Sequence, residues 1–420
     1  MNDTMHDPHL VPLDPSGWTH VRCPACGSSD VDTSGVVTPG IHMMGDHSCR
    51  SCGHEFLLDL PVGFGVQHPM AIGRSDGRLH NPGDGGAWIH GPLLEGFRAP
   101  DDRAVRIERI VHRECREVVF LNTLDFLYGH VLLKLFNAHH YLEERPDLGL
   151  VLLVPRMFAW MVPEGVAEVW LVDLKLSQLH GWYTDLDRQV REGLAGFGTV
   201  FFGKGYAHPD HVPIDIARFT GQQPFPMERF LEEPPHVTFI AREDRLWFRS
   251  PLSKFLFRAT HPLGLRKLLA RLWVSDQDRL MRGTMKAIRR EFPGVSFTVA
   301  GLGRPGGFGG LAEDLRTLQM DEATERRWCA AYGRSQFVIG LHGSNMLLPT
   351  AHAGGCIEVL PYDRYENFVQ DVAVRYADVM QLFLYRFVDE FATPRQVARH
   401  ALSMFRDFRT YYRNNRTNVF

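Results

Sequence analysis

Residues 336–361 read QFVIGLHGSNMLLPTAHAGGCIEVLP, which combines the signals of a β-strand, a turn, a short helix and a second strand. The first apolar run ends at Gly340, and the second begins at Cys356. Short apolar runs bounded by turn residues are typical of buried strands. Strands joined through a helix form βαβ units, and βαβ units build parallel sheets. The segment therefore predicts an α/β fold.

The turn in this segment carries residues suited to an anionic ligand. His342, Gly343, Ser344 and Asn345 stand between the first strand and the helix start. Backbone N–H groups and a helix dipole favour an anion at such a position. Gly343 permits close approach of a phosphate, and the other three can donate to it. Glu358, near the end of the next strand, is suited to accept ribose hydroxyls. The alternative is an ordinary strand–turn–helix in which Ser344 or Asn345 only caps the helix.

The same alternation of strand and helix extends over most of the chain. It predicts one Rossmann-like lobe at residues 105–230 and a second at 236–390, followed by a C-terminal helix at 391–420. The proline-rich stretch TGQQPFPMERFLEEPPH, residues 220–236, is predicted to link the lobes. A ligand is expected in the cleft between them, at the carboxyl ends of the strands. The predicted strand runs outside 336–361 are REVVFLNTL (116–124), LGLVLLVP (148–155), AEVWLVDL (167–174), GTVFFG (198–203), HVTFIARE (236–243) and VSFTVAGLG (295–303).

Cysteines near the N-terminus predict a metal site. Cys23 and Cys26 form the motif CPAC, Cys49 and Cys52 form CRSC, and a glycine follows each pair. Two CxxC knuckles at this separation can place thiolates tetrahedrally around one structural Zn²⁺. Unrelated cysteines or two disulfides are the alternative. We interpret residues 1–60 as a small zinc ribbon.

Two glycine-rich stretches have no clear periodicity. Residues 61–104 are rich in Gly, Pro and His, and predict a long irregular connection. GLGRPGGFGG, residues 301–310, lacks a helix start after its last glycine and contains Pro305. A flexible loop acting as a lid is therefore favoured over a specific phosphate cradle.

Composition limits the possible classes of protein. The chain has 420 residues, 44% hydrophobic and 23% charged, with a formal charge of −3. This charge argues against a protein that coats nucleic acid or an anionic membrane through its overall charge. The N-terminus lacks the pattern of a secretory signal, and no apolar run has the length of a membrane span. Cys115, Cys329 and Cys356 form no disulfide framework, so a reducing cytoplasm is the expected location.

The segment 336–361 resembles the donor-binding signature of GT-B glycosyltransferases. The resemblance is to the superfamily of the EGF-domain O-linked GlcNAc transferases and plant xylosyltransferases. Those enzymes carry a strand, a G-x-H-G-[AS]-x loop, a helix of small residues and an I-E-[IV]-x-P strand. The matching residues here are Gly340, His342, Gly343, Ser344, Ile357, Glu358, Val359 and Pro361.

Two further stretches are similar to the same superfamily. HVTFIAREDRLWFRS, residues 236–250, resembles a strand ending in R-x-x-R, which implies that Arg242 and Arg245 bind the donor phosphates. LYGHVLLKLFNAHHYL, residues 127–142, resembles a helix start near the acceptor, which implies that His130 lies in the cleft. The asparagine that often follows the arginine pair is absent, and the zinc ribbon is not part of the pattern.

The resemblance implies an acceptor lobe at 105–230, a donor lobe at 236–390, and transfer from a nucleotide-sugar donor without a covalent intermediate. Arg242 would stabilise the charge of the leaving diphosphate. No D-x-D step follows a predicted strand, so the sequence does not require a metal at the donor. His130 is the first candidate for the general base, with Asp125 and Glu243 as alternatives.

Other functions stay open at this point. A zinc-ribbon protein associated with nucleic acid, with a nucleotide-binding α/β body, is one alternative. An inactive GT-B relative that only binds its ligand is another, and a nucleotide-sugar epimerase is a third. The sequence does not identify the sugar, the nucleotide or the oligomeric state, and a protein, a glycan and a small molecule all stay open as the acceptor.

Overall fold

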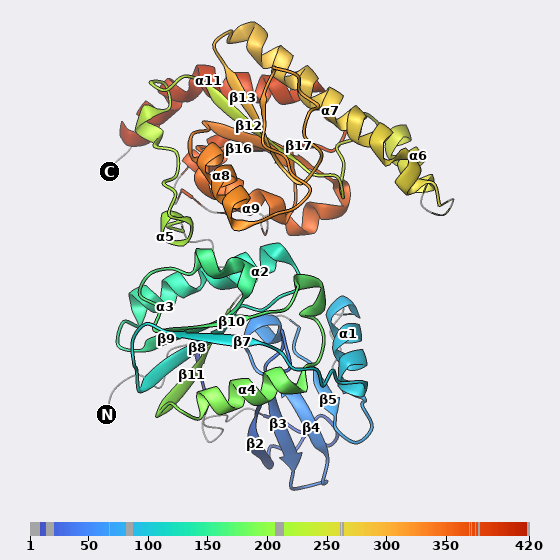
Figure 1. The fold of residues 1–420 in the computed structure, drawn as a ribbon, viewed down its shortest axis with the longest axis vertical. Coiled ribbons are helices and arrows are strands. Elements are labelled where there is room, and N and C mark those ends of the chain that lie inside the picture. Colours follow the sequence, from blue (N-terminus) through green and yellow to red (C-terminus); the bar gives the residue numbers. More distant parts are fainter. Residues whose placement is uncertain are drawn as a thin grey trace. The chain divides into compact units, whose positions relative to one another are not determined.

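The computed structural model describes residues 9–13, 21–66, 68–80, 87–205, 214–260, 262, 264–368, 370, 372, 373, 375, 376 and 379–417. Parts of the expected segments 1–60, 61–104 and 391–420 lie outside these residues. The chain forms two compact units, Met1–Pro209 and Asp210–Phe420 (Figure 1). Each unit is an α/β structure built on a central sheet, and each is described here by itself.

The central sheet of the second unit is entirely parallel, as the strand–helix alternation predicts. Its strand order is β14-β13-β12-β15-β16-β17. Numbered along the chain from β12, this is the order 3-2-1-4-5-6 of doubly wound nucleotide-binding sheets. The order reverses between β12 and β15, so their carboxyl ends flank the topological switch point, where ligands of such sheets bind. The strands are β12 (His236–Ala241), β13 (Ser296–Gly301), β14 (Glu313–Asp314), β15 (Phe337–Leu341), β16 (Cys356–Leu360) and β17 (Tyr385–Asp389).

Helices cover this sheet on both faces. α7 packs against α11 on one side, and α8 packs against α9 on the other (Figure 1). Asp321 caps α8, because its Oδ1 accepts the N–H of Thr324 at 2.8 Å. The helices are α5 (Ala217–Thr220), α6 (Pro251–Ala259), α7 (Arg266–Glu291), α8 (Glu322–Gly333), α9 (Leu347–His352), α10 (Met380–Leu384) and α11 (Pro394–Thr417).

The proline-rich stretch 220–236 is part of the second unit and is not a linker. Phe225 and Phe230 are each 1% exposed. Phe230 stacks on Phe408 of α11 with ring centroids 3.9 Å apart. The expected linker therefore contributes to the core, because its aromatic side chains bury more apolar surface than an exposed connection would. The boundary between the units lies earlier, at Pro209.

The central sheet of the first unit is mixed. Its order is β1-β11-β8-β9-β10-β7, in which β11, β8, β9 and β10 are parallel and the two edge strands run antiparallel to them. The edge strands β1 and β7 carry no pattern that predicts them from the sequence. β8 has β9 on one side and β11 on the other, so its carboxyl end is the switch point of this sheet. The strands are β1 (Leu10–Pro12), β7 (Ile107–Val111), β8 (Glu117–Asn122), β9 (Gly149–Pro155), β10 (Glu168–Val172) and β11 (Thr199–Gly203).

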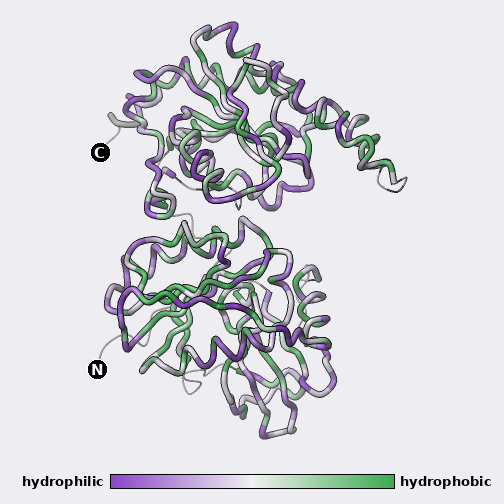
Figure 2. The backbone as a smooth tube through the Cα atoms, in the orientation of Figure 1, coloured by the Kyte–Doolittle hydropathy of each residue, from purple (hydrophilic) through white to green (hydrophobic). Residues whose placement is uncertain are grey.

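Helices and 3-10 turns connect these strands. The segment through Trp160 forms the 3-10 turn η4 and no α-helix. Figure 2 shows that the strands of both central sheets are mainly hydrophobic, as buried strands should be. No helix in the described part of the chain is both long and apolar enough to cross a membrane. The connecting elements are α2 (Tyr128–Phe136), α3 (Ala138–Glu144), η4 (Arg156–Met161), η5 (Leu176–Gln178) and α4 (Thr184–Leu194).

The cysteine region extends further than expected. A separate antiparallel sheet has the order β2-β3-β4-β5-β6 and continues to His80, so residues 61–104 are not an irregular connection. Ile41 and Phe64 share one hydrophobic core with Val118 and Phe120 of the central sheet. The sheet therefore packs into the first unit. Its short strands depend on this packing, so periodicity in the sequence does not indicate them. Its elements are β2 (Val31–Val37), β3 (Met44–Cys49), β4 (Glu55–Asp59), η3 (Gly63–Val66), β5 (Ala71–Gly73), β6 (Leu79–His80) and α1 (Ala87–Arg98).

Candidate functional site

Arg242 lies immediately after β12, at the switch point of the second unit. Its Nε donates to Oδ1 of Asp244 at 2.7 Å, its Nη2 donates to Oδ2 of the same carboxylate, and its Nη1 donates to Oδ1 of Asn345 at 2.6 Å. The Arg242 side chain is 14% exposed, and that of Asp244 is 69% exposed. Desolvation opposes the charge on Asp244, but its hydrogen bonds to Arg242 and the Arg242 charge lower the pKa of this carboxyl. The guanidinium is thus held in one orientation.

Arg245 lies close to Arg242 at the Gly343 turn, and Arg364 is near enough to Arg245 for its charge to act on it. Arg245 donates from Nη1 to the carbonyl oxygen of His342 at 2.9 Å. Burial, followed by the charges of Arg242 and Arg364, lowers the pKa of Arg245. Burial is the largest cause, and the two neighbouring positive charges lower this pKa further against the opposing effects of Asp244 and Asp363. The three guanidiniums therefore form an electropositive cluster that an anion would stabilise.

Gly343 is the point on the β15 turn where two of these arginines approach the backbone. Its φ of +147° lies in the region that side chains rarely adopt. A Cβ atom at this position would lie 2.5 Å from Nη1 of Arg242 and 3.1 Å from Nη1 of Arg245. A side chain at this position would strain the backbone and displace Nη1 of Arg242, so glycine favours the observed arrangement of the arginines.

Two donors of this region lack an acceptor within the described chain. Nδ2 of Asn345 and Nε of Arg364 are buried and have no hydrogen-bond partner among the described residues. Buried donors are normally paired, so each such donor needs an explanation. Both lie in segments that follow the carboxyl ends of strands, Asn345 after β15 and Arg364 after β16. A ligand with acceptor oxygens would satisfy them.

His342 and Glu358 are placed differently from our expectation. Both side chains are fully buried, and Nδ1 of His342 lies 2.5 Å from Oε2 of Glu358. Nε2 of His342 faces the carbonyl oxygen of Asn367 at 3.3 Å. Glu358 lies inside β16 and not at its end, so a fully buried carboxylate contacts the imidazole instead of ribose. The pair holds the β15 turn in place, and the ring of His342 is not exposed to a phosphate.

Ser344 begins a 3-10 turn, Ser344–Met346, which leads into α9. α9 has only six residues. So short a helix supplies a weaker dipole than the expected anion site at its start would need, because the dipole sums over aligned peptides. The arginine cluster, more than the helix start, makes this site electropositive.

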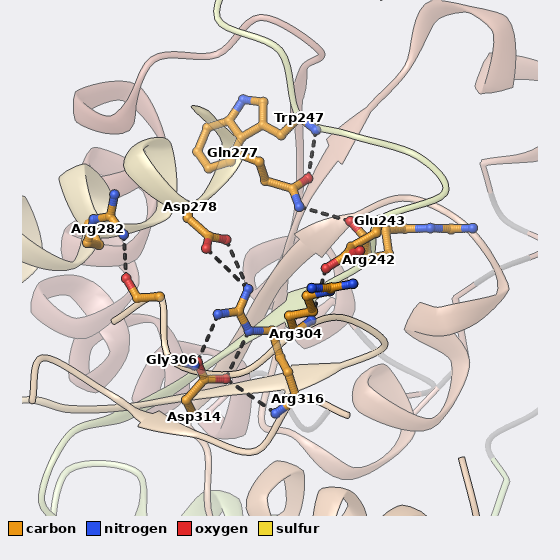
Figure 3. A network of polar contacts seen from close by, with 11 residues as sticks. Arg242, Glu243, Trp247, Gln277, Asp278, Arg282, Arg304, Gly306, Asp314 and Arg316 are labelled. Carbon is orange, nitrogen blue, oxygen red and sulfur yellow. Dashed lines mark hydrogen bonds and ion pairs between the residues drawn. The ribbon is translucent and has the colours of Figure 1, made fainter. Parts of the chain in front are cut away.

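A buried polar network supports the loop that carries Arg242 (Figure 3). Gln277 donates to the carbonyl oxygen of Arg242 at 2.9 Å and accepts the N–H of Trp247 at 2.9 Å. Glu243, an alternative base in our sequence analysis, accepts the N–H of Arg304 at 2.9 Å. Its carboxylate therefore fastens the glycine-rich loop to the β12 loop.

The same network holds the glycine-rich loop 301–310, which we expected to be a flexible lid. Arg316 is 2% exposed and binds both Asp278 and Asp314, while Asp314 accepts the N–H of Gly306 at 2.8 Å (Figure 3). Arg282 donates to the carbonyl oxygen of Gly307. Hydrogen bonds to the backbone of Gly306 and Gly307, together with the Arg316–Asp278 ion pair, hold the loop against α7. The loop is therefore fixed in place and is not a lid.

A cavity of about 730 Å³ lies at the other edge of this sheet. Its lining includes His236 and Ser296, the first residues of β12 and β13, together with Glu313 and Arg334. Ligands of doubly wound sheets bind at the carboxyl ends of the strands, and this cavity is at the amino ends. We therefore do not place the functional site there.

The switch point of the first unit carries His130. Asp125 follows β8, is fully buried, and lies 2.9 Å from Nζ of Lys134 and 3.5 Å from Nδ1 of His130. Nζ of Lys134 also donates to the carbonyl oxygen of Leu124 at 2.9 Å. Burial opposes the charge on Asp125, but Lys134 and His130 lower the pKa of this carboxyl below its ordinary value. Asp125, an alternative base in our sequence analysis, is placed to orient His130.

Aromatic side chains surround His130. The ring of Phe64 lies 5.8 Å from the His130 ring, and Trp88 lies 6.1 Å from it. Nζ of Lys134 lies 4.4 Å from the Phe64 ring centroid, within the range of a cation–π contact. Phe64 and Trp88 come from the region after the cysteines, so no local motif near His130 could reveal them. Lys134 had a signal: it is a single charge in the apolar helix YGHVLLKLF.

The cysteines predicted to bind metal come together. The Sγ atoms of Cys23, Cys26, Cys49 and Cys52 all lie within 4.8 Å of one another, and the cross-knuckle pairs are 3.7 Å apart. Sulfurs bound to one Zn²⁺ at about 2.3 Å would lie about 3.8 Å apart in a tetrahedron. A disulfide needs about 2.05 Å, so neither pair is one. The group is positioned to hold a metal ion, and its donor set and spacing are consistent with zinc.

The glycines after the knuckles have the backbone that the turns require. Gly27 has φ +76° and Gly53 has φ +71°. Their N–H groups donate to the carbonyl oxygens of Cys23 and Cys49, each at 2.8 Å. These turns close each knuckle, as the sequence predicts.

Comparison with known proteins adds little about function. No family model matches the chain, and no curated protein does. Similar solved structures include MnaA of S. aureus with UDP, at 11% identity and a TM-score of 0.27, over 71% of this chain and 68% of that one. Another is an apo structure of OtsA, at 11% identity and a TM-score of 0.25, over 76% and 69%. TM-scores this low support no functional argument.

Proposed function

We propose that this protein is a glycosyltransferase of the GT-B type that uses a nucleoside-diphosphate sugar as donor. The observation that carries the proposal is the arginine cluster of Arg242, Arg245 and Arg364 at the switch point of a 3-2-1-4-5-6 sheet. That position binds nucleotides in doubly wound folds, and clustered guanidiniums suit a diphosphate. The resemblance of residues 236–250 and 336–361 to a donor-binding signature supports the sugar.

In this proposal the cluster stabilises the leaving group. The bond between the anomeric carbon and the diphosphate oxygen breaks as the acceptor attacks, and negative charge develops on the diphosphate. Arg242 and Arg245 would donate to its oxygens, and the backbone of Gly343 would allow their close approach. Permanent cations supply this stabilisation without a metal at the donor.

His130 is the proposed general base for the acceptor. The carboxylate of Asp125 beside Nδ1 favours the tautomer with its proton on Nδ1, which leaves the basic lone pair on Nε2. Nε2 would take the acceptor proton as the new glycosidic bond forms. The aromatic rings around His130 reduce its contact with water, which strengthens these interactions.

The proposal assigns the cysteine group a structural Zn²⁺ and the protein a reducing, cytoplasmic location. Thiolates that bind zinc, together with the scattered Cys115, Cys329 and Cys356, suit a compartment that keeps thiols reduced. Zinc with four thiolate ligands has no open position for substrate, so the metal would stabilise the first unit and take no part in transfer.

The first test is calorimetric titration of the zinc-loaded full-length protein with nucleoside diphosphates and nucleotide sugars. We expect one diphosphate to bind with one-to-one stoichiometry, and Arg242→Ala to weaken it at least 100-fold. Arg249→Ala is the matched control, since Arg249 is 57% exposed and pairs with Asp276. No binding across the panel, or equal loss in both variants, would overturn the donor site. Binding without transfer to any acceptor would favour the inactive binding module.

A further inference from the structure

The helical hairpin formed by α6 and the start of α7 has an unusual composition. Residues 251–275, PLSKFLFRATHPLGLRKLLARLWVS, contain Lys and Arg at five positions and no Asp or Glu. The whole chain has a formal charge of −3, so this segment departs sharply from the average. It also contains many leucine and phenylalanine residues. Its basic residues are Lys254, Arg258, Arg266, Lys267 and Arg271.

The hairpin exposes its large apolar side chains. On α6, the exposed fractions are Leu252 65%, Phe255 66% and Leu256 48%. On α7, they are Leu268 75% and Leu272 65%. Residues three or four apart share one side of a helix, so each group forms a continuous apolar surface. Figure 2 shows this hydrophobic stretch at the end of the hairpin that extends away from the sheet of the second unit. Clustered exposed residues of this kind mark an interaction surface.

The opposite side of the hairpin is already packed. Phe257 of α6 lies 5.9 Å from the ring of Trp273 of α7, and both contact Phe248. Nζ of Lys254 lies 2.5 Å from Oε2 of Glu390, near the end of β17. These contacts fix the hairpin to the second unit. The exposed leucines therefore form an outer surface of the second unit.

The charges on this surface indicate what it contacts. Arg258 and Arg271 are exposed and form no ion pair within the described part of the chain. Exposed leucine and phenylalanine side chains beside Arg258 and Arg271, in a segment that contains no acid, match the boundary of a bilayer, where acyl chains lie next to anionic headgroups. A second copy of the chain fits poorly, because a symmetric contact would bring two strongly basic segments together.

We propose that the α6–α7 hairpin is an interfacial anchor that binds an anionic lipid bilayer. Leu252, Phe255 and Leu268 would enter the boundary between headgroups and acyl chains, and Arg258 and Arg271 would contact lipid phosphates. The helices lie on the membrane and do not span it. This inference does not depend on the identity of the donor, but it implies that the protein works at a membrane surface.

The test is flotation of the full-length, zinc-loaded protein with vesicles. Phosphatidylcholine vesicles are compared with vesicles that also contain phosphatidylglycerol, at low and high salt. We expect binding to the anionic vesicles only, with a loss of at least tenfold at high salt, because salt screens the arginines. No binding to anionic vesicles at low salt would overturn the proposal.

Substitutions separate the apolar and charged contributions. Leu252→Ser combined with Phe255→Ser should reduce vesicle binding at least tenfold, while Leu382→Ser, at a 75% exposed position on α10, should not. Arg258→Glu should weaken binding, while Arg327→Glu on α8 should not. Equal loss in the controls would contradict a specific surface. A dimer in sedimentation that dissociates in the Leu252/Phe255 variant would show a second copy on this face and overturn the lipid proposal.

Discussion

The charged side chains at the switch points of the two central sheets are balanced differently. In the second unit, Arg242, Arg245 and Arg364 lie close together, and burial and mutual repulsion lower the pKa of Arg245. In the first unit, Asp125 and Lys134 are fully buried and compensate each other at 2.9 Å. Similar strand edges thus produce a cluster of three arginines, of which Arg242 is paired with Asp244, and a triad in which Asp125 and Lys134 balance each other. The first is suited to an anion, and the second is suited to moving a proton.

Metal removal should have the largest effect of the changes proposed here. It should destabilise the first unit and leave ligand binding by the second unit unchanged. Chelation, or Cys49→Ser, should unfold the cysteine region, because structural zinc binding is worth on the order of 10 kcal/mol. Hydrogen exchange should show lost protection in β2–β4, while diphosphate binding by the second unit stays within twofold. Cys115→Ser, a cysteine outside the metal group, is the control. Full protection after complete zinc removal would contradict a structural metal.

Replacing His130 should reduce turnover without affecting the donor. His130→Gln is expected to lower kcat by about 10²- to 10⁴-fold, the usual range for a lost general base. Diphosphate affinity should not change. The acidic limb of the pH–rate profile should disappear, which a purely structural role would not cause. His180→Gln, an exposed histidine near Phe126, is the control, and a loss of similar size there would remove the case for His130.

A single methyl group at the β15 turn should damage the cation cluster. Gly343→Ala must accommodate φ +147° and a Cβ atom 2.5 Å from Nη1 of Arg242. We expect diphosphate affinity to fall about 10- to 100-fold with a native melting curve for the first unit. Gly294→Ala is the control, because nothing lies within 4 Å of its Cβ position. Unchanged affinity in Gly343→Ala would show that the arginines do not converge on this turn in solution.

The second unit should lose stability as pH falls from 6.5 to 4. Burial lowers the pKa of His236 and of His352 from 6.5 to about 4. The unfolded chain therefore binds more protons in this range, and each histidine lowers the free energy of unfolding by up to about 1.4 kcal/mol per pH unit. Hydrogen exchange of β12 and β16 amides against pH measures this loss. His352→Gln should give a shallower dependence, and an unchanged slope would contradict the assignment.

Local patterns predicted the elements but not all of their partners. All the predicted strand runs form strands, and the glycines after the CxxC pairs have the left-handed backbone that such turns use. Arg364 was missed although it follows β16 by a few residues, because a lone arginine after a strand is common. The short strands β5 and β6 were missed because their burial depends on packing against other strands.

The sequence by itself determined the α/β class, the cysteine group that is positioned to hold a metal ion, and the placement of Arg242 and the 342–345 turn at strand ends. These follow from contacts between residues close in the chain, where periodicity and turn chemistry act. Only the tertiary structure decided that Arg242 meets Asn345, that Glu358 is buried against His342, and that Phe64 and Trp88 surround His130. Such contacts depend on strand order and on the packing of distant segments, which local patterns do not encode.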